Sequence, residues 1–476
     1  MRKLSTFCRK WFSGLFFILA LPVFAQELPS SVKYELELAG IPENSVGIVV
    51  EQVDSNVPRL THNADIAFAP ASTMKVLTTY AALELLGPSY TWETGAYISG
   101  KPEDGVLYGD LIIKGSGDPV FTQKELWLFI RQIQDAGVRD IRQEVLKHIL
   151  DRSVFKTGPF DAAAFDAEPL KPYNAGPDAL LLNEKKIDVR LVPNESENTV
   201  KVVFEPRLDG VKITPPLLSN GECGNWKKDI VLQFDDRHAN FDGIYSSTCQ
   251  EKIWSVLPYQ MSNTRYFESV FSTLWKEAGG RFKGRFVDGT LPPEALKIAE
   301  WRSPELSSVV STVNKHSNNV MARQLLLGIG HHEFGDNADE SMGIKAIKNW
   351  LASKNISSGD LVIENGSGLS RLEKMSPLTM SRILKAAFHS PVMPELMSSF
   401  PIAGKDGTMS KRLKEDAIAG KAHIKTGAID NVRAIAGYVL AKSGRRYIVV
   451  CMVNDPNAKL SRNMLNELLN WTYENN

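Results

Sequence analysis

A serine and a lysine three residues apart form the most reactive pattern in the sequence, Ser72-Thr-Met-Lys75. The pattern opens an apolar stretch, residues 71–86, which predicts a helix buried in a domain core. Positions i and i+3 share one helical face, so the Ser72 hydroxyl and the Lys75 amine can meet there. Burial lowers the pKa of a lysine, and a neutral amine can activate a serine. We therefore expect Ser72 as a nucleophile and Lys75 as its base.

The spacing alone is weak evidence, because Ser30-Ser-Val-Lys33 repeats it. A surface lysine beside an N-capping serine also accounts for it. A second element, Ser317-Asn-Asn319, stands at the start of a predicted helix, residues 318–327, directly after another apolar helix. A hydroxyl and an amide in that setting could face a shared cleft, and the alternative is a simple N-cap.

The third element, Lys425-Thr-Gly427, ends a predicted strand at residues 420–426 and is followed by Ala428. The Lys425 ammonium could bind a substrate carboxylate at the strand edge, where Gly427 leaves room for a peptide. Lys156-Thr-Gly158 has the same letters, but it precedes the second element. It also runs into Pro159, which would stop strand pairing there.

The order S-x-x-K, S-x-N, K-T-G is typical of penicillin-binding proteins and β-lactamases. With these motifs, the chain after its first 25 residues resembles the D-alanyl-D-alanine carboxypeptidase/endopeptidase family. These are the class C low-molecular-mass penicillin-binding proteins of the penicillin-binding protein 4 type. That family inserts extra domains between its first two motifs, and here 241 residues separate Lys75 from Ser317.

The resemblance implies a serine peptidase that cleaves D-Ala-D-Ala and D-Ala-diaminopimelyl bonds of peptidoglycan stem peptides through an acyl-enzyme. β-Lactam antibiotics would acylate the same serine. Ser317 would relay a proton to the leaving amine, and the backbone N–H groups of Ser72 and Ala428 would form the oxyanion hole. The expected substrate-binding residues are Asn319, Lys425, Thr426, Gly427 and Ala428.

Two positions depart from the family's pattern. Asn365 stands where Asp usually precedes Gly366-Ser-Gly-Leu-Ser-Arg371, and Ala428 replaces the usual hydroxyl residue after K-T-G. Ala428 bears on substrate choice, because it follows the substrate strand. Two other functions stay open: a β-lactamase, against which the long insertion argues, and a non-catalytic muropeptide-binding protein. The sequence also leaves open the preference for free or crosslinked peptides and the formation of a homodimer.

Composition indicates a globular protein, and the first residues indicate one that is exported. The chain has 476 residues, 43% hydrophobic and 23% charged, as in a globular protein. Lys plus Arg and Asp plus Glu are both 55, so no positive field indicates nucleic acid. Four basic residues precede an apolar run, residues 11–24, which predicts a cleaved signal peptide over residues 1–25. We expect a periplasmic protein, soluble or loosely associated with the membrane.

Export makes disulfides available. Cys223 and Cys249 lie in a loop-rich stretch and are expected to pair, with three free thiols as the alternative. Cys451 lies in an apolar run and is expected in a buried strand. No C-x-x-C or H-E-x-x-H spacing occurs, so no metal and no cofactor are expected.

The predicted elements indicate an α/β fold. The resemblance implies a penicillin-recognising serine transpeptidase/β-lactamase-like domain, an antiparallel sheet flanked by helices, from residues 26–95 and 280–476. Residues 96–279 would form one or two inserted, mostly β domains with one helical patch at residues 123–136. Strands are expected at residues 46–53, 420–426, 433–441 and 445–454, and helices at 305–314, 318–327, 339–353, 377–387 and 461–473.

Overall fold

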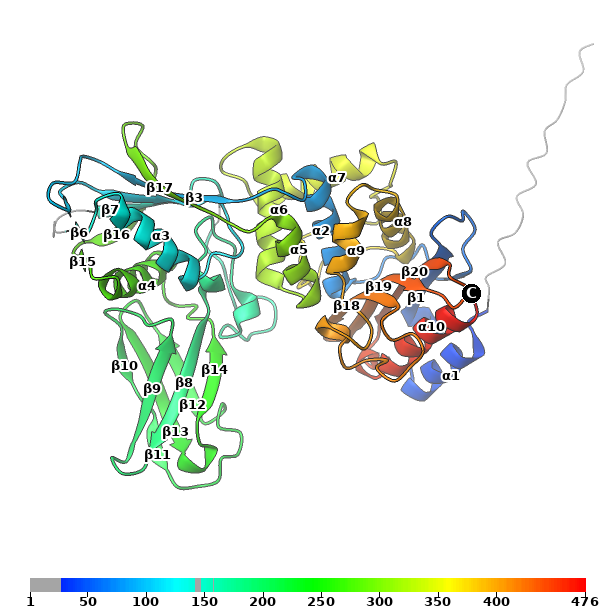
Figure 1. The fold of residues 1–476 in the computed structure, drawn as a ribbon. Helices are drawn as coiled ribbons and strands as arrows, with labels where there is room; N and C mark the ends of the chain where they lie inside the picture. The colour runs from blue at the N-terminus through cyan, green and yellow to red at the C-terminus, as the bar shows by residue number, and fades with distance from the viewer. Residues whose placement is uncertain (1–26, 142–146, 157) are drawn as a thin grey trace, which may run out of the picture.

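The computed structural model describes residues 27–141, 147–156 and 158–476. The expected signal peptide, residues 1–25, lies outside the described residues. Figure 1 shows a helix-rich lobe and a second lobe that ends in a strand-rich tip. Within the described ranges, no helix combines the length and the apolar character needed to cross a membrane.

The first lobe is built on an antiparallel sheet in the order β18-β19-β20-β1-β2 (Figure 1). Its strands are β18 (Ala422–Ile429), β19 (Val432–Leu440), β20 (Arg446–Asn454), β1 (Val46–Gln52) and β2 (Leu60–His62). Successive residues point to opposite faces, so Ala436 and Val450 join one hydrophobic core while Ile435 and Cys451 join the other. Both faces are buried, which explains why these strands are continuous apolar runs.

Helices from both ends of the chain cover this sheet. The helices that share the core of one face are α2 (Met74–Leu85), α5 (Leu306–Lys315), α6 (Asn319–Phe334), α7 (Glu340–Ser353), α8 (Pro377–Phe388) and α9 (Met393–Ser399). The other face is covered by α1 (Ser30–Ala39) and α10 (Arg462–Glu474). The first and last helices of the described chain thus pack side by side.

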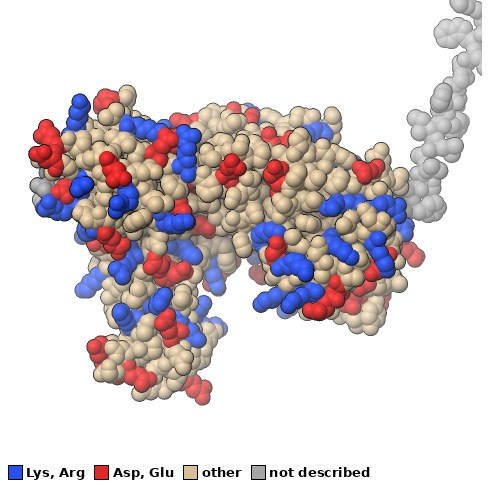
Figure 2. Space-filling model, in the orientation of Figure 1, with Lys and Arg blue, Asp and Glu red and all other residues tan. Residues whose placement is uncertain are grey.

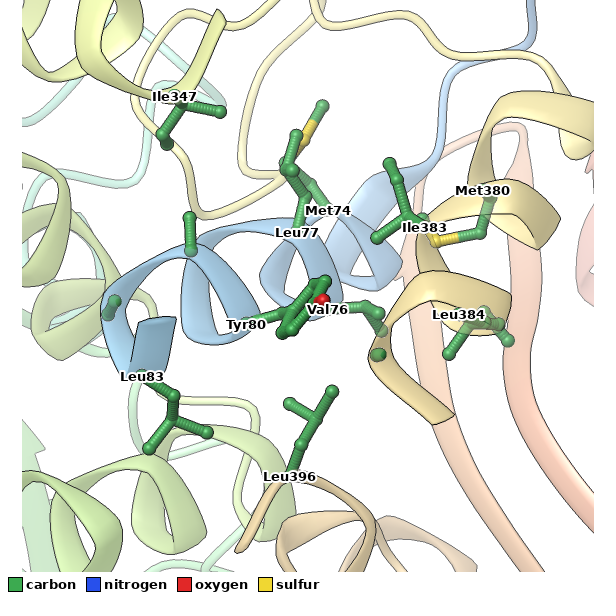
Figure 3. Close-up of a cluster of buried hydrophobic side chains, with 14 of the residues drawn as sticks. Met74, Val76, Leu77, Tyr80, Leu83, Ile347, Met380, Ile383, Leu384 and Leu396 are labelled. Carbon is green, nitrogen blue, oxygen red and sulfur yellow. The ribbon is translucent and has the colours of Figure 1, made fainter. Parts of the chain in front are cut away.

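Helix α2 lies in the middle of the first core. Every residue from Met74 to Leu83 is buried. Figure 3 shows its apolar side chains, Val76 and Tyr80 among them, facing Leu384 of α8 and Leu396 of α9. The expected buried helix is confirmed except for its first turn, because Ala71–Thr73 form a separate 3-10 turn, η2. Lys75 therefore lies in the buried part of α2, whereas Ser72 lies in the turn that precedes the helix.

The second lobe contains a mixed sheet in the order β16-β7-β5-β3-β17. Its strands are β3 (Glu93–Ile98), β5 (Leu111–Lys114), β7 (Lys147–Asp151), β16 (Arg285–Gly289) and β17 (Leu296–Arg302). A smaller parallel sheet joins β4 (Val106–Leu107), β6 (Asp140–Ile141) and β15 (Arg281–Phe282). β15 and β16 follow the boundary expected at residue 280, yet they pair with β6 and β7 of the insertion, and β17 pairs with β3, which spans the boundary expected at residue 95.

Two helices pack on this lobe, α3 (Gln123–Asp135) and α4 (Asn263–Glu277). The expectation of a single helical patch in the insertion is wrong, because α4 was missed. Its Phe, Val and Thr residues favour strands locally. Ser262 nevertheless caps the helix by accepting from the Arg265 N–H, and residues 266, 267, 270 and 271 give one buried face.

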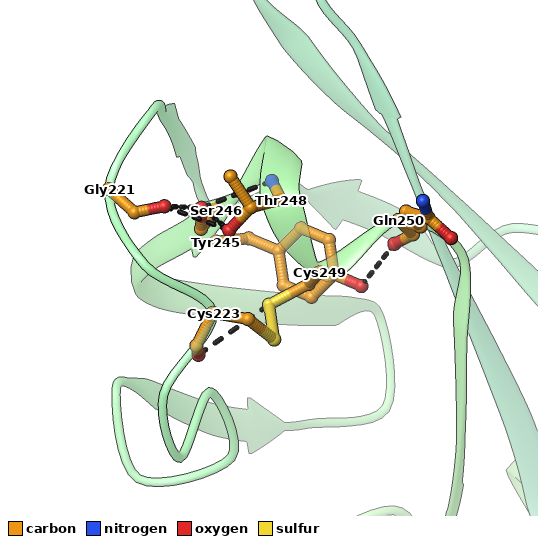
Figure 4. Close-up of a disulfide and its surroundings, with 7 residues drawn as sticks. All are labelled: Gly221, Cys223, Tyr245, Ser246, Thr248, Cys249 and Gln250. Atoms are coloured by element: carbon orange, nitrogen blue, oxygen red, sulfur yellow. Dashed lines mark hydrogen bonds between the residues drawn. A yellow bond between two sulfur atoms is a disulfide. The ribbon is translucent and has the colours of Figure 1, made fainter.

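The strand-rich tip contains two small sheets. The first joins β14 (Lys252–Val256), β8 (Ile187–Asn194) and β9 (Thr199–Glu205), and the second joins β10 (Lys212–Thr214), β11 (Leu217–Ser219) and β12 (Ile230–Phe234) to β13 (His238–Ser246). Cys223 and Cys249 form a disulfide that ties the loop before β12 to the short 3-10 turn, Ser247–Cys249, that follows β13 (Figure 4). Figure 2 shows a deep notch between this tip and the first lobe, with charges of both signs interspersed over the visible face.

Candidate active site

The three sequence motifs meet beside β18. Lys75 Nζ lies 3.0 Å from Ser72 Oγ and 2.6 Å from Asn319 Oδ1. Lys425 Nζ lies 2.9 Å from Ser317 Oγ. Lys75 and Lys425 are both fully buried, whereas the two serines are partly accessible. The cluster therefore combines two partly accessible hydroxyls with two buried amines.

The turn that carries Ser72 is fixed by close packing. Thr73 donates to the Pro70 carbonyl through both its N–H, at 3.2 Å, and its hydroxyl, at 2.6 Å. Gly368 has φ +80, and a Cβ there would lie 1.9 Å from the Ala71 carbonyl oxygen. Gly427 packs on the other side, where a Cβ would lie 2.8 Å from the Pro70 carbonyl oxygen. Gly427 thus makes room for the Ser72 turn itself.

Three oxygen atoms surround Lys75 Nζ, and they can accept from an ammonium or share a neutral amine. Besides Ser72 and Asn319, its Nζ contacts the Ser367 carbonyl oxygen. A neutral amine has two N–H donors and one lone pair, and the two carbonyl-type oxygens can only accept. The lone pair therefore remains for the Ser72 hydroxyl. Burial holds the pKa of Lys75 well below its ordinary value, and the charge of Lys425 lowers it further.

The loop that presents the Ser367 carbonyl is held by Asn365. Its Oδ1 accepts from the N–H of Ser367 at 2.9 Å and from the Ser367 hydroxyl at 2.6 Å. Its Nδ2 donates to the Leu369 carbonyl at 3.0 Å. An aspartate could make the first two contacts but not the third. The departure from the family's pattern therefore has a local role in this chain.

Glu373 is a residue of this loop that sequence reasoning missed. The side chain is 1% exposed, and its Oε1 accepts the backbone N–H groups of Glu364, Asn365 and Gly366 at 3.0–3.1 Å. Burial raises the pKa of this carboxyl, while those N–H groups and Lys75 oppose the rise. The sequence could not mark this glutamate, which follows the G-S-G-L-S-R stretch by two residues, because its partners are backbone groups and no side-chain pattern points to them.

Ser317 lies in the turn between α5 and α6, with φ +57. Asn318 is the N-cap of α6, because its side chain accepts from the Met321 N–H. The middle residue of the S-x-N motif thus caps the helix, which leaves Ser317 and Asn319 for the cluster.

Lys425 lies within β18, which continues to Ile429. The expectation that K-T-G ends its strand is wrong, because residues 427–429 pair with β19 through residues 432–434. Lys425 Nζ donates to the Thr426 carbonyl at 2.8 Å as well as to Ser317. Burial lowers the pKa of Lys425 to about 7.

The remaining expected substrate residues flank this lysine on β18. Thr426 Oγ1 lies 2.7 Å from Thr408 Oγ1, and Ala428 is exposed. The Thr426 hydroxyl and the Ala428 backbone therefore stand on the accessible side of the strand. The expected disulfide residues, Cys223 and Cys249, lie apart from the cluster in the second lobe.

A second residue missed by sequence reasoning reaches the motifs from the insertion. Asn318 Nδ2 donates to Glu184 Oε1 at 2.8 Å. Glu184 belongs to a turn of three consecutive non-glycine residues with left-handed backbone, Asn183, Glu184 and Lys185, at φ +51, +52 and +53. Burial raises the pKa of Glu184. No periodic pattern marks such a turn, so only the fold shows that the insertion touches the S-x-N loop.

Among the residues that the structure describes, no group of three or more His, Cys, Asp or Glu side chains could hold a metal ion. The cluster itself offers hydroxyls, amines, one amide and backbone groups. This set is sufficient for acyl transfer to a serine.

Sequence comparisons place the cluster in a family context. The model of the D-Ala-D-Ala carboxypeptidase 3 (S13) family matches residues 30–475. The D-alanyl-D-alanine carboxypeptidase DacB of Haemophilus influenzae is 24% identical over 491 residues, which cover 99% of this chain and 100% of that protein. A D-alanyl-D-alanine carboxypeptidase of Actinomadura is 24% identical over 452 residues, 88% of this chain and 79% of that protein.

Solved structures agree with the sequence comparisons. The crystal structure of penicillin-binding protein 4 of Haemophilus influenzae gives a TM-score of 0.78 at 24% identity, covering 92% of this chain and 99% of that one. Its complex with a β-lactam gives 0.74 at 23% identity, covering 93% and 99%. This likeness confirms the expected fold class, an antiparallel sheet flanked by helices with a large strand-rich insertion. Together with the match over residues 30–475, it leads to one conclusion: the chain belongs to the D-Ala-D-Ala carboxypeptidase 3 (S13) family.

Proposed function

We propose that the protein is a serine D,D-peptidase that cleaves D-Ala-D-Ala and D-Ala-diaminopimelyl bonds of peptidoglycan stem peptides through an acyl-enzyme. One observation carries the proposal: Asn319 and the Ser367 carbonyl take both donors of a neutral Lys75, which leaves its lone pair for Ser72. Family membership and the carboxypeptidase relatives support the same reaction.

Acylation begins when Ser72 Oγ bonds to the carbonyl carbon of D-Ala and its proton passes to Lys75 Nζ. The carbonyl oxygen becomes an oxyanion, for which the backbone N–H groups of Ser72 and Ala428 are the proposed donors. Such donors typically contribute about 3 kcal/mol each to transition-state stabilisation.

Collapse of the tetrahedral intermediate breaks the C–N bond and leaves an ester on Ser72. Ser317 gives a proton to the leaving amine. The proton that Lys75 took from Ser72 then replaces the one that Ser317 gave away, so both side chains return to their starting state. Water then attacks the ester, the acyl C–O bond breaks, and the proton from water returns to Ser72 Oγ.

Lys425 and Thr426 are the proposed binding groups for the substrate's terminal carboxylate. Lys425 donates to two oxygens, Ser317 Oγ and the Thr426 carbonyl, so an ammonium there retains one N–H. A bound carboxylate stabilises that ammonium, and the ammonium in turn favours a neutral Lys75. Substrate binding would thus prepare the base.

The test is incubation of the purified protein with benzylpenicillin, followed by intact mass over time, with Ser72→Ala as the control. We expect a long-lived adduct on the wild type and none on Ser72→Ala. Rapid loss of the antibiotic without an adduct would instead indicate a β-lactamase. An inert wild type would favour a non-catalytic muropeptide-binding protein.

We further propose that the protein acts in the periplasm. The pattern of residues 1–25 is that of a signal peptide, and the Cys223–Cys249 disulfide fits an oxidising compartment. Fractionation of cells, with the mass of the mature chain, tests both points; a cytoplasmic protein that keeps residues 1–25 would contradict them.

A further inference from the structure

A cavity of about 970 Å³ lies in the second lobe, away from the two serine–lysine pairs. Arg152, Asp288 and Thr264 line it, where β7 and β16 end and α4 begins. β7 and β16 are parallel neighbours. Ligands in sheets of this kind bind outside the carboxyl ends of parallel strands. The volume is in the range of sites that enclose a small ligand or a peptide segment.

Most charges in the cavity balance one another. Arg152 Nε donates to Asp178 Oδ1 at 2.9 Å, and its Nη1 contacts Asp288. Asn263 Nδ2 donates to Asp178 Oδ2 at 2.6 Å, and Thr264 Oγ1 donates to Asp288 Oδ1 at 2.9 Å. Asp178 is only 3% exposed. Both carboxylates are therefore occupied before any ligand arrives.

Lys185 is the exception. It lines the cavity, and its Nζ makes no hydrogen bond or ion pair with any residue in the described ranges. Burial lowers the pKa of Lys185 to about 8, with Asp178 and Asp236 opposing the shift. Asp236 is exposed, and one of its oxygens already accepts the Ser262 N–H at 2.8 Å. An ammonium with unused donors thus stands in a confined space.

The backbone that holds Lys185 is strained. Lys185 is the last of three consecutive non-glycine residues, 183–185, in the left-handed region, which is unfavourable for a residue with a Cβ. Asn183 anchors the turn by donating its N–H to the Phe121 carbonyl at 2.9 Å. Strain of this kind persists where the surrounding structure enforces it, often at ligand sites.

The cavity shares wall residues with a second groove. The walls that the cavity shares with this groove are Pro159, Phe160, Ala162 and Pro177. The groove, of about 600 Å³, is also lined by Asn365. Asn365 holds Ser367, whose carbonyl contacts Lys75. A peptide bound at Ser72 could therefore extend past Phe160 into the cavity.

We propose that this cavity binds a carboxylate-bearing segment of the wall peptide remote from the scissile bond, with Lys185 pairing to the carboxylate. The inference rests on the proposed function, because the peptide must reach the cavity from the acylated serine. It adds a binding site in the insertion, which would favour crosslinked peptides over short ones.

The test compares Lys185→Met with Lys186→Met in the full chain. Lys186 is a matched control, because it is the next residue but lies outside the cavity and faces Asp188 at 3.5 Å. The substrate is a peptide dimer joined by a D-Ala-diaminopimelyl bond. One version of the dimer has all its carboxylates free. In the other version every carboxylate is a carboxamide, except the one on the residue that follows the scissile bond, which both versions keep.

We expect Lys185→Met to raise KM for the free-acid dimer about tenfold, the size of one charge-assisted hydrogen bond, with kcat unchanged. The carboxamide dimer should show the same rise on the wild type and no further rise on Lys185→Met. Lys185→Arg should restore binding, and Lys186→Met should behave as wild type. Equal KM values for wild type and Lys185→Met, or the same increase in KM for both dimers on Lys185→Met, would overturn the inference.

Two further measurements separate this inference from the proposed function. Benzylpenicillin should acylate Lys185→Met at the wild-type rate, because the antibiotic is too small to occupy both sites. If the wild type itself forms no adduct, the proposed function fails. Calorimetric titration of the free-acid dimer into Ser72→Ala, and into Ser72→Ala with Lys185→Met, measures binding without turnover; equal affinities would reject the cavity as a site.

Discussion

The candidate active site contains two serine–lysine pairs of similar geometry and different origin. The oxygen–nitrogen distance is 3.0 Å between Ser72 and Lys75 and 2.9 Å between Ser317 and Lys425. The first pair is local, because its members lie three residues apart across the start of one helix. The second joins residues 108 positions apart and requires β18 to lie against the turn between α5 and α6.

The two lysines differ in how their donors are used. Both neighbours of Lys75 other than Ser72 are carbonyl-type oxygens, so a neutral amine there can only accept from the Ser72 hydroxyl. Lys425 has a hydroxyl and one carbonyl as partners, which leaves a donor for a carboxylate. The pairs therefore look alike but suit different tasks, with Lys75 as a base and Lys425 as a cation.

Removal of Lys75 should have the largest effect on acylation. Lys75→Met leaves Ser72 in place but takes away its base, and general-base catalysis contributes 10²–10⁴-fold. We expect acylation by benzylpenicillin to slow about 10⁴-fold, measured by intact mass, because no other base contacts Ser72 Oγ in the described structure. A variant that acylates within tenfold of wild type would show that Lys75 is not the base. Thermal unfolding serves as the control for folding.

Removal of Lys425 should have a smaller effect of a different kind. Lys425→Met should slow acylation about 10²-fold, because the antibiotic's carboxylate loses its partner. Loss of the positive charge also raises the pKa of Lys75, so the rise in acylation rate with pH should move to higher pH, by roughly one unit.

Lys425→Arg is the control for charge, since it should keep the pH profile closer to wild type. The measurement is the acylation rate between about pH 5 and about pH 10, a range that ends near the ordinary pKa of a lysine. An unchanged profile for Lys425→Met would mean that the two lysines titrate independently.

The local pair is also the part of the site that the sequence could predict. Ser72 and Lys75 share a helix start, and their meeting needs only helical spacing and an apolar context. The partners of the second pair could be named only through the order of motifs, because no spacing relates Ser317 to Lys425. The loop around Ser367 was noticed as a family stretch, but its contact with Lys75 depends on tertiary packing.

The fold shows the same division. Four of the five strands of the first lobe's sheet were predicted within one to three residues, because both faces are buried and the runs are apolar throughout, whereas the three-residue edge strand β2 was not predicted. Helix α4 was missed because its strand-forming residues form a helix only against the core of the second lobe. Glu184 could not be predicted at all, since its left-handed turn has no glycine to mark it.

Removal of Glu184 should have an intermediate effect on the loop that supplies Ser317 to the second pair and Asn319 to the first. Glu184→Ala removes the acceptor that holds Asn318, the residue between Ser317 and Asn319. We expect acylation to slow about tenfold through kcat, since a hydrogen bond to a charged group is worth roughly 1.5–3 kcal/mol.

Glu184→Gln keeps an acceptor oxygen and should recover most of the rate, which separates positioning of the loop from a general loss of packing. The double variant with Asn318→Ala should be no slower than Asn318→Ala alone, because both changes break one contact. Additive losses in the acylation rate would contradict a shared role.

The smallest effect should come from Asn365, which supports the first pair through Ser367. Asn365→Asp keeps the acceptor for Ser367 but loses the donor to Leu369 and sets a carboxylate against a carbonyl. We expect acylation to slow about threefold, which is less than the loss of one full hydrogen bond would cause. The effect is small because the side chain at position 365 still fixes the Ser367 carbonyl. Asn365→Ala, which loses every contact, should be slower than Asn365→Asp. If the aspartate variant is instead the slower one, the charge beside Lys75 matters more than the loop geometry, and the local pair depends on electrostatics as the distant pair does.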